Sequence, residues 1–257
     1  MKTGPQYIES LRQVKPELYY MGEKIEDRVD HPAIRPHINA AAETYQMAHE
    51  PQFQSLFTTT SHLTGERINR FTHIHQSSED LITKVKMLRA AGQRTGSCFQ
   101  RCAGFDAMNA LYGVTYEVDK ARETDYHPRF VEFLRYIQAN DLMPGGAMTD
   151  SKGDRSLPPS KQADPDQYLH VVEKRKNGIV VRGAKVHQTG AVNSHEIIVV
   201  PTRALGPDEA DWAVAFSVPA DTKGMIYFFG RQGNDNRKWE DKIDQGNPQY
   251  GVVGGEA

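Results

Sequence analysis

Cysteine is scarce in this sequence, because its 257 residues contain only Cys98 and Cys102. The first residues lack the apolar core of a signal peptide, so we expect a cytoplasmic protein without a structural disulfide. No apolar run approaches the roughly 20 residues needed to cross a bilayer. The formal net charge is only −2, which gives no electrostatic reason to expect nucleic acid or an acidic membrane surface as a partner.

The composition that is present, with 38% hydrophobic and 25% charged residues, is that of a globular protein. The length allows two domains with a sizeable core. The first half carries apolar residues at helical spacing. The expected helices are a short one capped by Thr3, one in residues 36–48, a longer region from Ser77 or Ser78 to about Tyr112 that Gly92 and Gly96 can break, and one over residues 127–139.

Beyond Pro144, β-type runs separated by turn signals dominate. A helical part followed by a β part predicts an α+β arrangement, with a helical domain over residues 1–142 and a β domain over residues 143–257. We expect residues 150–166 to form an exposed loop. The polar end of the chain does not look like a finished element, which suggests a truncated chain or one subunit of a split enzyme. The five β-type runs are residues 168–172, 179–186, 196–200, 212–218 and 225–229.

Cys98 and Cys102 form a C-x3-C pair. If they lie on a helix, residues four apart share one face, where a common ligand is easier to bind than a strain-free disulfide is to form. Taken alone, the pair is about as well explained as two small core residues. A closed metal site or cluster usually needs four ligands, so a site here must recruit histidine, carboxylate or residues from elsewhere.

The sequence around the cysteines is more specific than their spacing. The motif Ser97-Cys98-Phe99-Gln100-Arg101-Cys102 is accompanied by residues 6–11, 22–26, 29–32, 145–150, 152–155, 178–185, 187–190 and 193–196. In these stretches, which extend over essentially the whole chain, the sequence resembles the 4-hydroxybutyryl-CoA dehydratases. Their wider family also contains the flavin-dependent 4-hydroxyphenylacetate 3-hydroxylases.

The resemblance implies a fold like that of the acyl-CoA dehydrogenases, with N-terminal helices, a barrel-like middle β domain and a C-terminal helical bundle that this chain lacks. It implies FAD and a [4Fe–4S] cluster as cofactors, with Cys98 and Cys102 as two of the cluster ligands. The other ligands, a histidine and a third cysteine, would come from the C-terminal domain, in the same polypeptide or on a partner chain. The family also suggests a homotetramer.

The reaction that the resemblance implies is dehydration of 4-hydroxybutyryl-CoA to crotonyl-CoA, with isomerisation of vinylacetyl-CoA as a second activity. The β-hydrogen of this acyl-CoA substrate is not acidic, because it is not next to the thioester carbonyl. The family's proposed solution is transient one-electron oxidation by FAD, with a cluster iron as Lewis acid for the departing hydroxyl. We expect these 257 residues alone neither to close the cluster nor to catalyse the reaction.

Four residues are candidates for catalysis. On a helix, Gln100 would point about 200° away from both sulfurs, toward substrate, flavin or solvent. Arg89 could be a charge partner for cluster or flavin, or equally a surface arginine. Thr189 lies close to the flavin if the resemblance holds, and is otherwise an ordinary strand-end threonine. Glu256 stands where the family has an active-site glutamate, although a frayed terminal residue is the alternative.

The loop that begins at Ala147 resembles the flavin-ring loop of acyl-CoA dehydrogenases. Backbone amides and a threonine hydroxyl can hydrogen-bond the ring edge, and the residues that follow suit a phosphate or the carbonyl side of the ring. A plain capping turn is the alternative. We expect His187 and His195 to be structural. The expected flavin-binding residues are Ala147, Met148, Thr149, Asp150, Asp154, Arg155, Ser156, Gln188 and Thr189.

Two other functions compete with the dehydratase. A two-component aromatic hydroxylase would use reduced FAD and oxygen and needs no cluster, so the C-x3-C pair speaks against it. A non-catalytic fragment or subunit is the third possibility, favoured by the missing C-terminal half.

Overall fold

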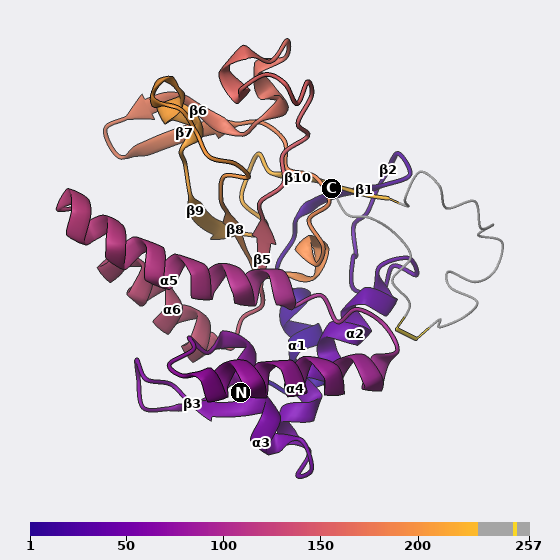
Figure 1. Cartoon of the computed structure of the whole chain (residues 1–257). Coiled ribbons are helices and arrows are strands. Elements are labelled where there is room, and N and C mark those ends of the chain that lie inside the picture. The colour runs from indigo at the N-terminus through magenta and orange to yellow at the C-terminus, as the bar shows by residue number, and fades with distance from the viewer. Residues whose placement is uncertain (231–248, 251–257) are drawn as a thin grey trace.

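The computed structural model describes residues 1–230 and 249–250, which form a mixed α/β structure (Figure 1). Helices occupy the lower part of the view in Figure 1, and the β6–β7 hairpin lies at its top. The helices are α1 (Gly4–Leu11), α2 (Arg35–Gln46), α3 (Gln54–Phe57), α4 (Ser78–Thr95), α5 (Cys102–Arg122) and α6 (Tyr126–Asn140), with short 3-10 turns that include η5 (Ala191–Asn193) and η6 (Pro207–Trp212).

The helix ends follow from local chemistry. Thr3 caps α1, as the sequence predicts, and it forms a capping box with Gln6. The hydroxyl of Ser77 accepts the N–H of Asp80 and caps α4, and Gly96 closes that helix with a φ of 60°. The region expected to reach about Tyr112 is therefore two helices, the second of which continues to Arg122.

Small sheets make up the β structure, and none of those in the described residues closes into a barrel. The barrel-like form implied by the resemblance is therefore not found there. One sheet has the order β10-β1-β2, another β5-β8-β9, and β3-β4 and β6-β7 are hairpins. The strands are β1 (Glu17–Tyr20), β2 (Glu23–Lys24), β3 (Thr58–Thr60), β4 (Arg67–Asn69), β5 (Pro144–Ala147), β6 (His170–Arg175), β7 (Gly178–Arg182), β8 (Glu196–Val199), β9 (Phe216–Pro219) and β10 (Ile226–Phe229).

Two parallel pairings join distant parts of the chain. β1 pairs with β10, with Glu17 opposite Ile226, and β5 pairs with β8. One hydrophobic cluster packs α1 and α2 against these strands, and a second lies among α3, α4, α5 and α6. The division into domains over residues 1–142 and 143–257 remains a prediction. Within the described part of the chain, no helix is both long enough and apolar enough to span a bilayer.

Candidate functional site

The two cysteines lie at the junction of α4 and α5, not on one helix. Cys98 is in the loop that follows Gly96, and Cys102 is the first residue of α5. The helical placement considered from the sequence is wrong, because Gly96 and Gln100 both have a φ of 60°, which interrupts the helical backbone. We call residues 96–102 the cysteine loop.

The two thiols are reduced and accessible to different degrees: Cys98 is exposed and Cys102 is half-buried. Burial, and next the neighbouring Cys98, raise the pKa of the Cys102 thiol to about 11, whereas the cation of Lys84 opposes that shift. Lys84 itself forms an ion pair with Asp106 of α5. No group of three histidine, cysteine or acidic side chains that could hold a metal ion occurs among residues 1–230 and 249–250. If the two cysteines bind a metal or a cluster, its other ligands must come from outside the described residues.

The residues between the thiols point into the protein. Arg101 is 2% exposed, and its guanidinium lies 4.1 Å from the ring centroid of Tyr45 and 4.6 Å from that of Phe71. Its Nη1 donates to the Thr44 hydroxyl at 3.0 Å. Cation–π contacts and this hydrogen bond hold the charge in the core. Arg101 therefore anchors the cysteine loop in the core, whereas Cys98 stays exposed and Cys102 half-buried.

Gln100 is also buried, at 3% exposure, so the solvated alternative for this residue is wrong. Its Nε2 lies 2.6 Å from Nδ1 of His37, and its Oε1 accepts a hydrogen bond from Nδ2 of Asn193. Both ends of the Gln100 amide are thus bonded to other residues of this chain. A contact of Gln100 with substrate or flavin remains a prediction.

A close contact between α5 and β5 brings the cysteine loop near the expected flavin loop. A Cβ added at Gly104, in the first turn of α5, would lie 1.9 Å from the carbonyl oxygen of Pro144. A Cβ at Gly146 would lie 3.1 Å from the backbone of Ala103. Only glycine permits backbones to approach this closely. The start of α5 is therefore fixed against the strand that leads into residues 147–150.

Six of the nine expected flavin-binding residues lie on two facing segments, residues 147–150 and 185–190, which we call the threonine loops. The N–H of Val186 donates to the carbonyl of Thr149 at 2.8 Å. The Gln188 side chain accepts from the N–H of Met148 at 3.1 Å and donates to the carbonyl of Thr149 at 3.0 Å. Within the described residues, the hydroxyls of Thr149 and Thr189 make no hydrogen bond. Two threonine hydroxyls are thus available to a polar ring edge.

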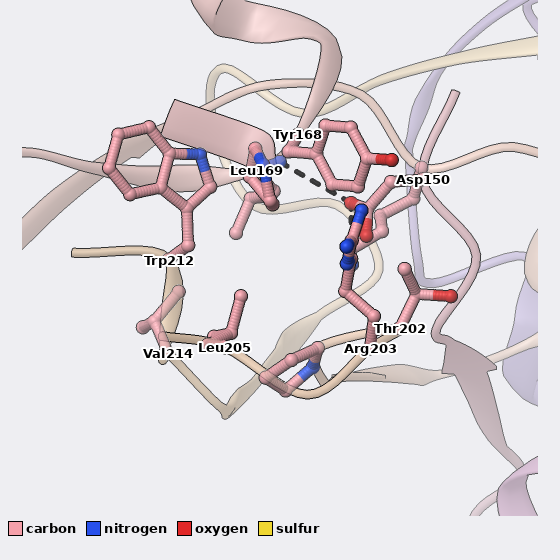
Figure 2. A pocket seen from close by; sticks show the side chains of 11 residues that line it. Asp150, Tyr168, Leu169, Thr202, Arg203, Leu205, Trp212 and Val214 are labelled. Carbon is pink, nitrogen blue, oxygen red and sulfur yellow. Dashed lines mark hydrogen bonds and ion pairs between the residues drawn. The ribbon is translucent and has the colours of Figure 1, made fainter. Parts of the chain in front are cut away.

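An ion pair between Asp150 and Lys185 joins the two threonine loops. Their charged atoms are 2.7 Å apart, with side chains only 4% and 10% exposed. Lys185 also donates to the carbonyls of Met148 and Val200, and Asp150 accepts the N–H of Leu169. Figure 2 shows Asp150 beside Leu169, in a pocket whose other side is formed by Trp212. This cavity, about 10 Å³, has room for roughly one water molecule and none for a cofactor.

The remaining candidates lie apart from this arrangement. Asp154, Arg155 and Ser156 are exposed, and Asp154 accepts both the N–H and the hydroxyl of Ser156. Arg89 is exposed on α4. Glu256 lies outside the described residues. The roles expected for all five residues remain predictions.

Sequence reasoning assigned no role to His37 or Asn193, although both are fully buried next to Gln100. Asn193 stands in one of the motifs that carry the family resemblance, which was the available signal. His195, in the same motif, has the geometry of a structural histidine: Nδ1 accepts the N–H of Met143 at 3.1 Å, and Nε2 lies 2.9 Å from the Ser10 hydroxyl. Burial, with nearby cations, lowers the pKa of His195 to about 3.

Comparison with known proteins places this geometry in a family. The chain is 55% identical, over 98% of its length, to the 4-hydroxybutyryl-CoA dehydratase/vinylacetyl-CoA-Δ-isomerase of Clostridium aminobutyricum, of which it covers 52%. Among solved structures, it is similar to the oxygen-tolerant archaeal 4-hydroxybutyryl-CoA dehydratase from N. maritimus, with 49% identity and a TM-score of 0.93 over 99% of this chain and 50% of that one. The resemblance seen in the sequence is confirmed.

A more distant likeness connects the chain to flavin monooxygenases. It is 28% identical, with a TM-score of 0.72, to the oxygenase component of 4-hydroxyphenylacetate 3-monooxygenase complexed with FAD, over 90% of this chain and 47% of that one. The chain spans about half the length of the relatives it matches. The model of the family described as 4-hydroxyphenylacetate 3-hydroxylase N terminal matches residues 3–254, and the chain therefore belongs to this family.

Proposed function

We propose that this chain is the N-terminal part of a flavin- and [4Fe–4S]-dependent 4-hydroxybutyryl-CoA dehydratase that also isomerises vinylacetyl-CoA. The observation that carries the proposal is the 55% identity over 98% of the chain to an enzyme of that name. The oxygenases of the family share less sequence with the chain, at 31%, 28% and 26% identity for three of them.

The cysteine loop fits half of a cluster site. The sulfurs of Cys98 and Cys102 stay at the edge of the fold, while Gln100 and Arg101 hold the loop from within. Two further ligands would have to come from the part of the enzyme that this chain does not span. An anchored loop with two accessible thiols is a preformed half-site, because its backbone loses little freedom when the metal binds.

The threonine loops fit the edge of a flavin ring. Thr149 and Thr189 offer hydroxyls, and Gln188 fixes the distance between the two segments. When bound, the flavin would supply one-electron chemistry and the cluster a Lewis-acid iron. This chain's own contribution is to hold both groups on one scaffold, since α5 and β5 touch at Gly104. We propose Arg89 and Glu256 as substrate- or cofactor-facing residues of the complete enzyme. Gln100, whose amide is bonded to His37 and Asn193, would act through the loop that it holds.

The test is anaerobic purification of the complete enzyme, meaning this chain with the rest of its relatives' length in the same polypeptide or on a partner. We expect flavin together with about four irons and four sulfides per chain. Cys98→Ser and Cys102→Ser should lose most of the iron and the dehydratase activity. Ser97→Ala, in the same loop, should keep both. Flavin without iron, or unchanged iron in Cys98→Ser, would contradict the proposal.

An aromatic hydroxylase is the second candidate, because the chain is similar to an oxygenase complexed with FAD. Its test is oxygen-dependent hydroxylation of 4-hydroxyphenylacetate by the iron-free enzyme supplied with reduced FAD. Turnover under these conditions, with none on 4-hydroxybutyryl-CoA, would select this function over the dehydratase.

The complete enzyme is proposed to be a cytoplasmic homotetramer.

A further inference from the structure

A buried polar link joins the cysteine loop to the threonine loops. Gln100 points into the protein, where its amide contacts His37 of α2 and Asn193 of η5. His37 and Asn193 are both 0% exposed. Three side chains from widely separated parts of the sequence therefore meet at one amide, in a place that water does not reach.

In the structure, the two amides and the imidazole of this link form a consistent set of donors and acceptors. Asn193 donates through Nδ2 to Oε1 of Gln100, which leaves Nε2 of Gln100 to donate to Nδ1 of His37. Rotating the Gln100 amide by 180° would bring two NH₂ groups face to face. Both hydrogen bonds hold the side chain of Gln100, whose backbone has a φ of 60°.

The η5 end of the link is rigid. The Tyr7 hydroxyl donates to the carbonyl of Asn193 at 2.7 Å, and Arg28 donates to the carbonyl of Val192 at 2.7 Å. Gly190, just before η5, has a φ of 87°, and a Cβ there would lie 2.5 Å from the carbonyl oxygen of Gln100. The backbones of the two loops are therefore in direct contact at Gly190.

From Gly190 the connection continues into the threonine loops. Thr189 precedes it directly, and Gln188 is the residue bonded to Met148 and Thr149. Contacts therefore run without a gap from Gln100 through Asn193 and Gly190 to the segment that carries Thr189 and, through Gln188, to Thr149.

We propose that His37 and Asn193 are positioning residues that couple the two loops, so that the iron–sulfur cluster and the flavin bind cooperatively. This inference rests on the proposed function, because it assigns those two groups to the two loops. A small shift of the cysteine loop on cluster binding would move Gln100, and the link would then change the positions of Thr149 and Thr189 at the flavin site. Coupling between sites is reciprocal, so the flavin must favour cluster binding by the same factor.

The experiment measures the dissociation constant of FAD, by flavin fluorescence, for the cluster-loaded and the cluster-free forms of the complete enzyme. In the parent enzyme we expect FAD to bind about 5-fold or more tightly when the cluster is present, the lower end of usual coupling. His37→Leu removes the acceptor for Gln100, whereas His37→Asn, of nearly the same shape as leucine, keeps an acceptor at the δ position. We expect the ratio to fall to about 1 in His37→Leu and to be restored in His37→Asn.

Asn193→Ala is a second variant, for which we expect the same loss of coupling. It provides the test if His37→Leu does not fold. Ser61→Ala is the control for a generic loss of a buried hydrogen bond, because Ser61 bonds Gln138 at 2.6 Å outside the link. It should keep the parent ratio. A ratio of 1 in the parent, or a parent-like ratio in both His37→Leu and Asn193→Ala, would overturn the inference. Absence of iron from the parent would instead refute the proposed function.

Discussion

In the cysteine loop, the residues between the thiols are buried in the core, whereas the threonine loops carry a half-buried Thr149 and an exposed Thr189. Arg101 and Gln100 anchor the first through side chains that are almost fully buried. Gln188 and the Asp150–Lys185 pair anchor the second through bonds that mostly end on backbone atoms. Loops with similar expected roles are thus immobilised by different means. The first should respond to changes in the core, and the second to changes in a few polar contacts.

The largest effect on stability is expected from removing the Asp150–Lys185 ion pair, which anchors the threonine loops. Lys185→Met leaves the Asp150 carboxylate buried without its cation, which should cost about 3–5 kcal/mol of unfolding free energy. Lys174→Met is the matched control, because Lys174 pairs with Asp211 at the same 2.7 Å but with both side chains largely exposed. It should cost less than about 1 kcal/mol. Urea denaturation of both variants checks this difference, and equal losses would show that burial does not decide it.

The next largest effect is expected from disturbing the contact between α5 and β5, which holds the cysteine loop near the threonine loops. Gly104→Ala forces a Cβ against the Pro144 carbonyl, and such overpacking costs about 1–3 kcal/mol or more. Gly113→Ala, on the same helix with open space around it, should instead stabilise the protein by about 0.5–1 kcal/mol. Thermal unfolding with iron analysis is the measurement. A Gly104→Ala enzyme that is fully stable and retains its iron would show that the α5–β5 contact is not needed.

A pH effect of intermediate size concerns His195, which supports the start of β5 through Met143. Its folded-state pKa of about 3 lies below the unfolded value near 6.5, so the unfolded chain binds the extra proton between these pH values. Stability is therefore full above pH 6.5 and is lost as the pH falls through this window. Between pH 7.5 and 5.5, His195 should account for about 1.4 kcal/mol of the loss. The difference between parent and His195→Asn in urea unfolding at the two pH values isolates this share; identical pH profiles would contradict it.

The smallest effect tests the outward side of the threonine loops. Thr149→Val and Thr189→Val each remove one hydroxyl that is free of hydrogen bonds within the described chain. Each should weaken FAD binding to the complete enzyme by about 5-fold, the value of one hydrogen bond near 1 kcal/mol, with little change in stability. Thr149→Ser keeps the hydroxyl and should bind as the parent does. Flavin titration decides, and parent affinity in both valine variants would remove these residues from the flavin site.

Much of the local structure could be predicted from the sequence, because its signals are local. Thr3, Ser77 and Gly96 mark helix ends where capping and left-handed glycine chemistry predict them. Each of the five expected β-type runs overlaps one strand, although the run 212–218 begins in η6, four residues before β9. The short strands β2, β3, β4 and β5 were not expected. The parallel pairing of β1 with β10 was not, because the pairing partner of a short strand is set by tertiary contacts far away in the chain.

The candidate site was predicted in part for the same reason. Family motifs pointed to Cys98, Cys102 and the threonine loops. The spacing of the two cysteines, however, could not show that a loop and not a helix separates them. The break depends on the left-handed backbone of Gln100, which glutamine does not favour by itself. That conformation is stabilised by His37 and Asn193, which lie 63 and 93 residues away in the sequence.

The pairing of β1 with β10 also sets an order of events during synthesis. Glu17 leaves the ribosome roughly 200 residues before its partner Ile226, which at about 5–20 residues per second is a delay of some ten to forty seconds. During this time the edge of β1 that β10 later covers has unpaired backbone groups, and such an edge can pair with another chain. The nascent chain is therefore exposed to aggregation until its β10 segment emerges, and a chaperone that shields residues 17–20 would raise the yield of folded protein.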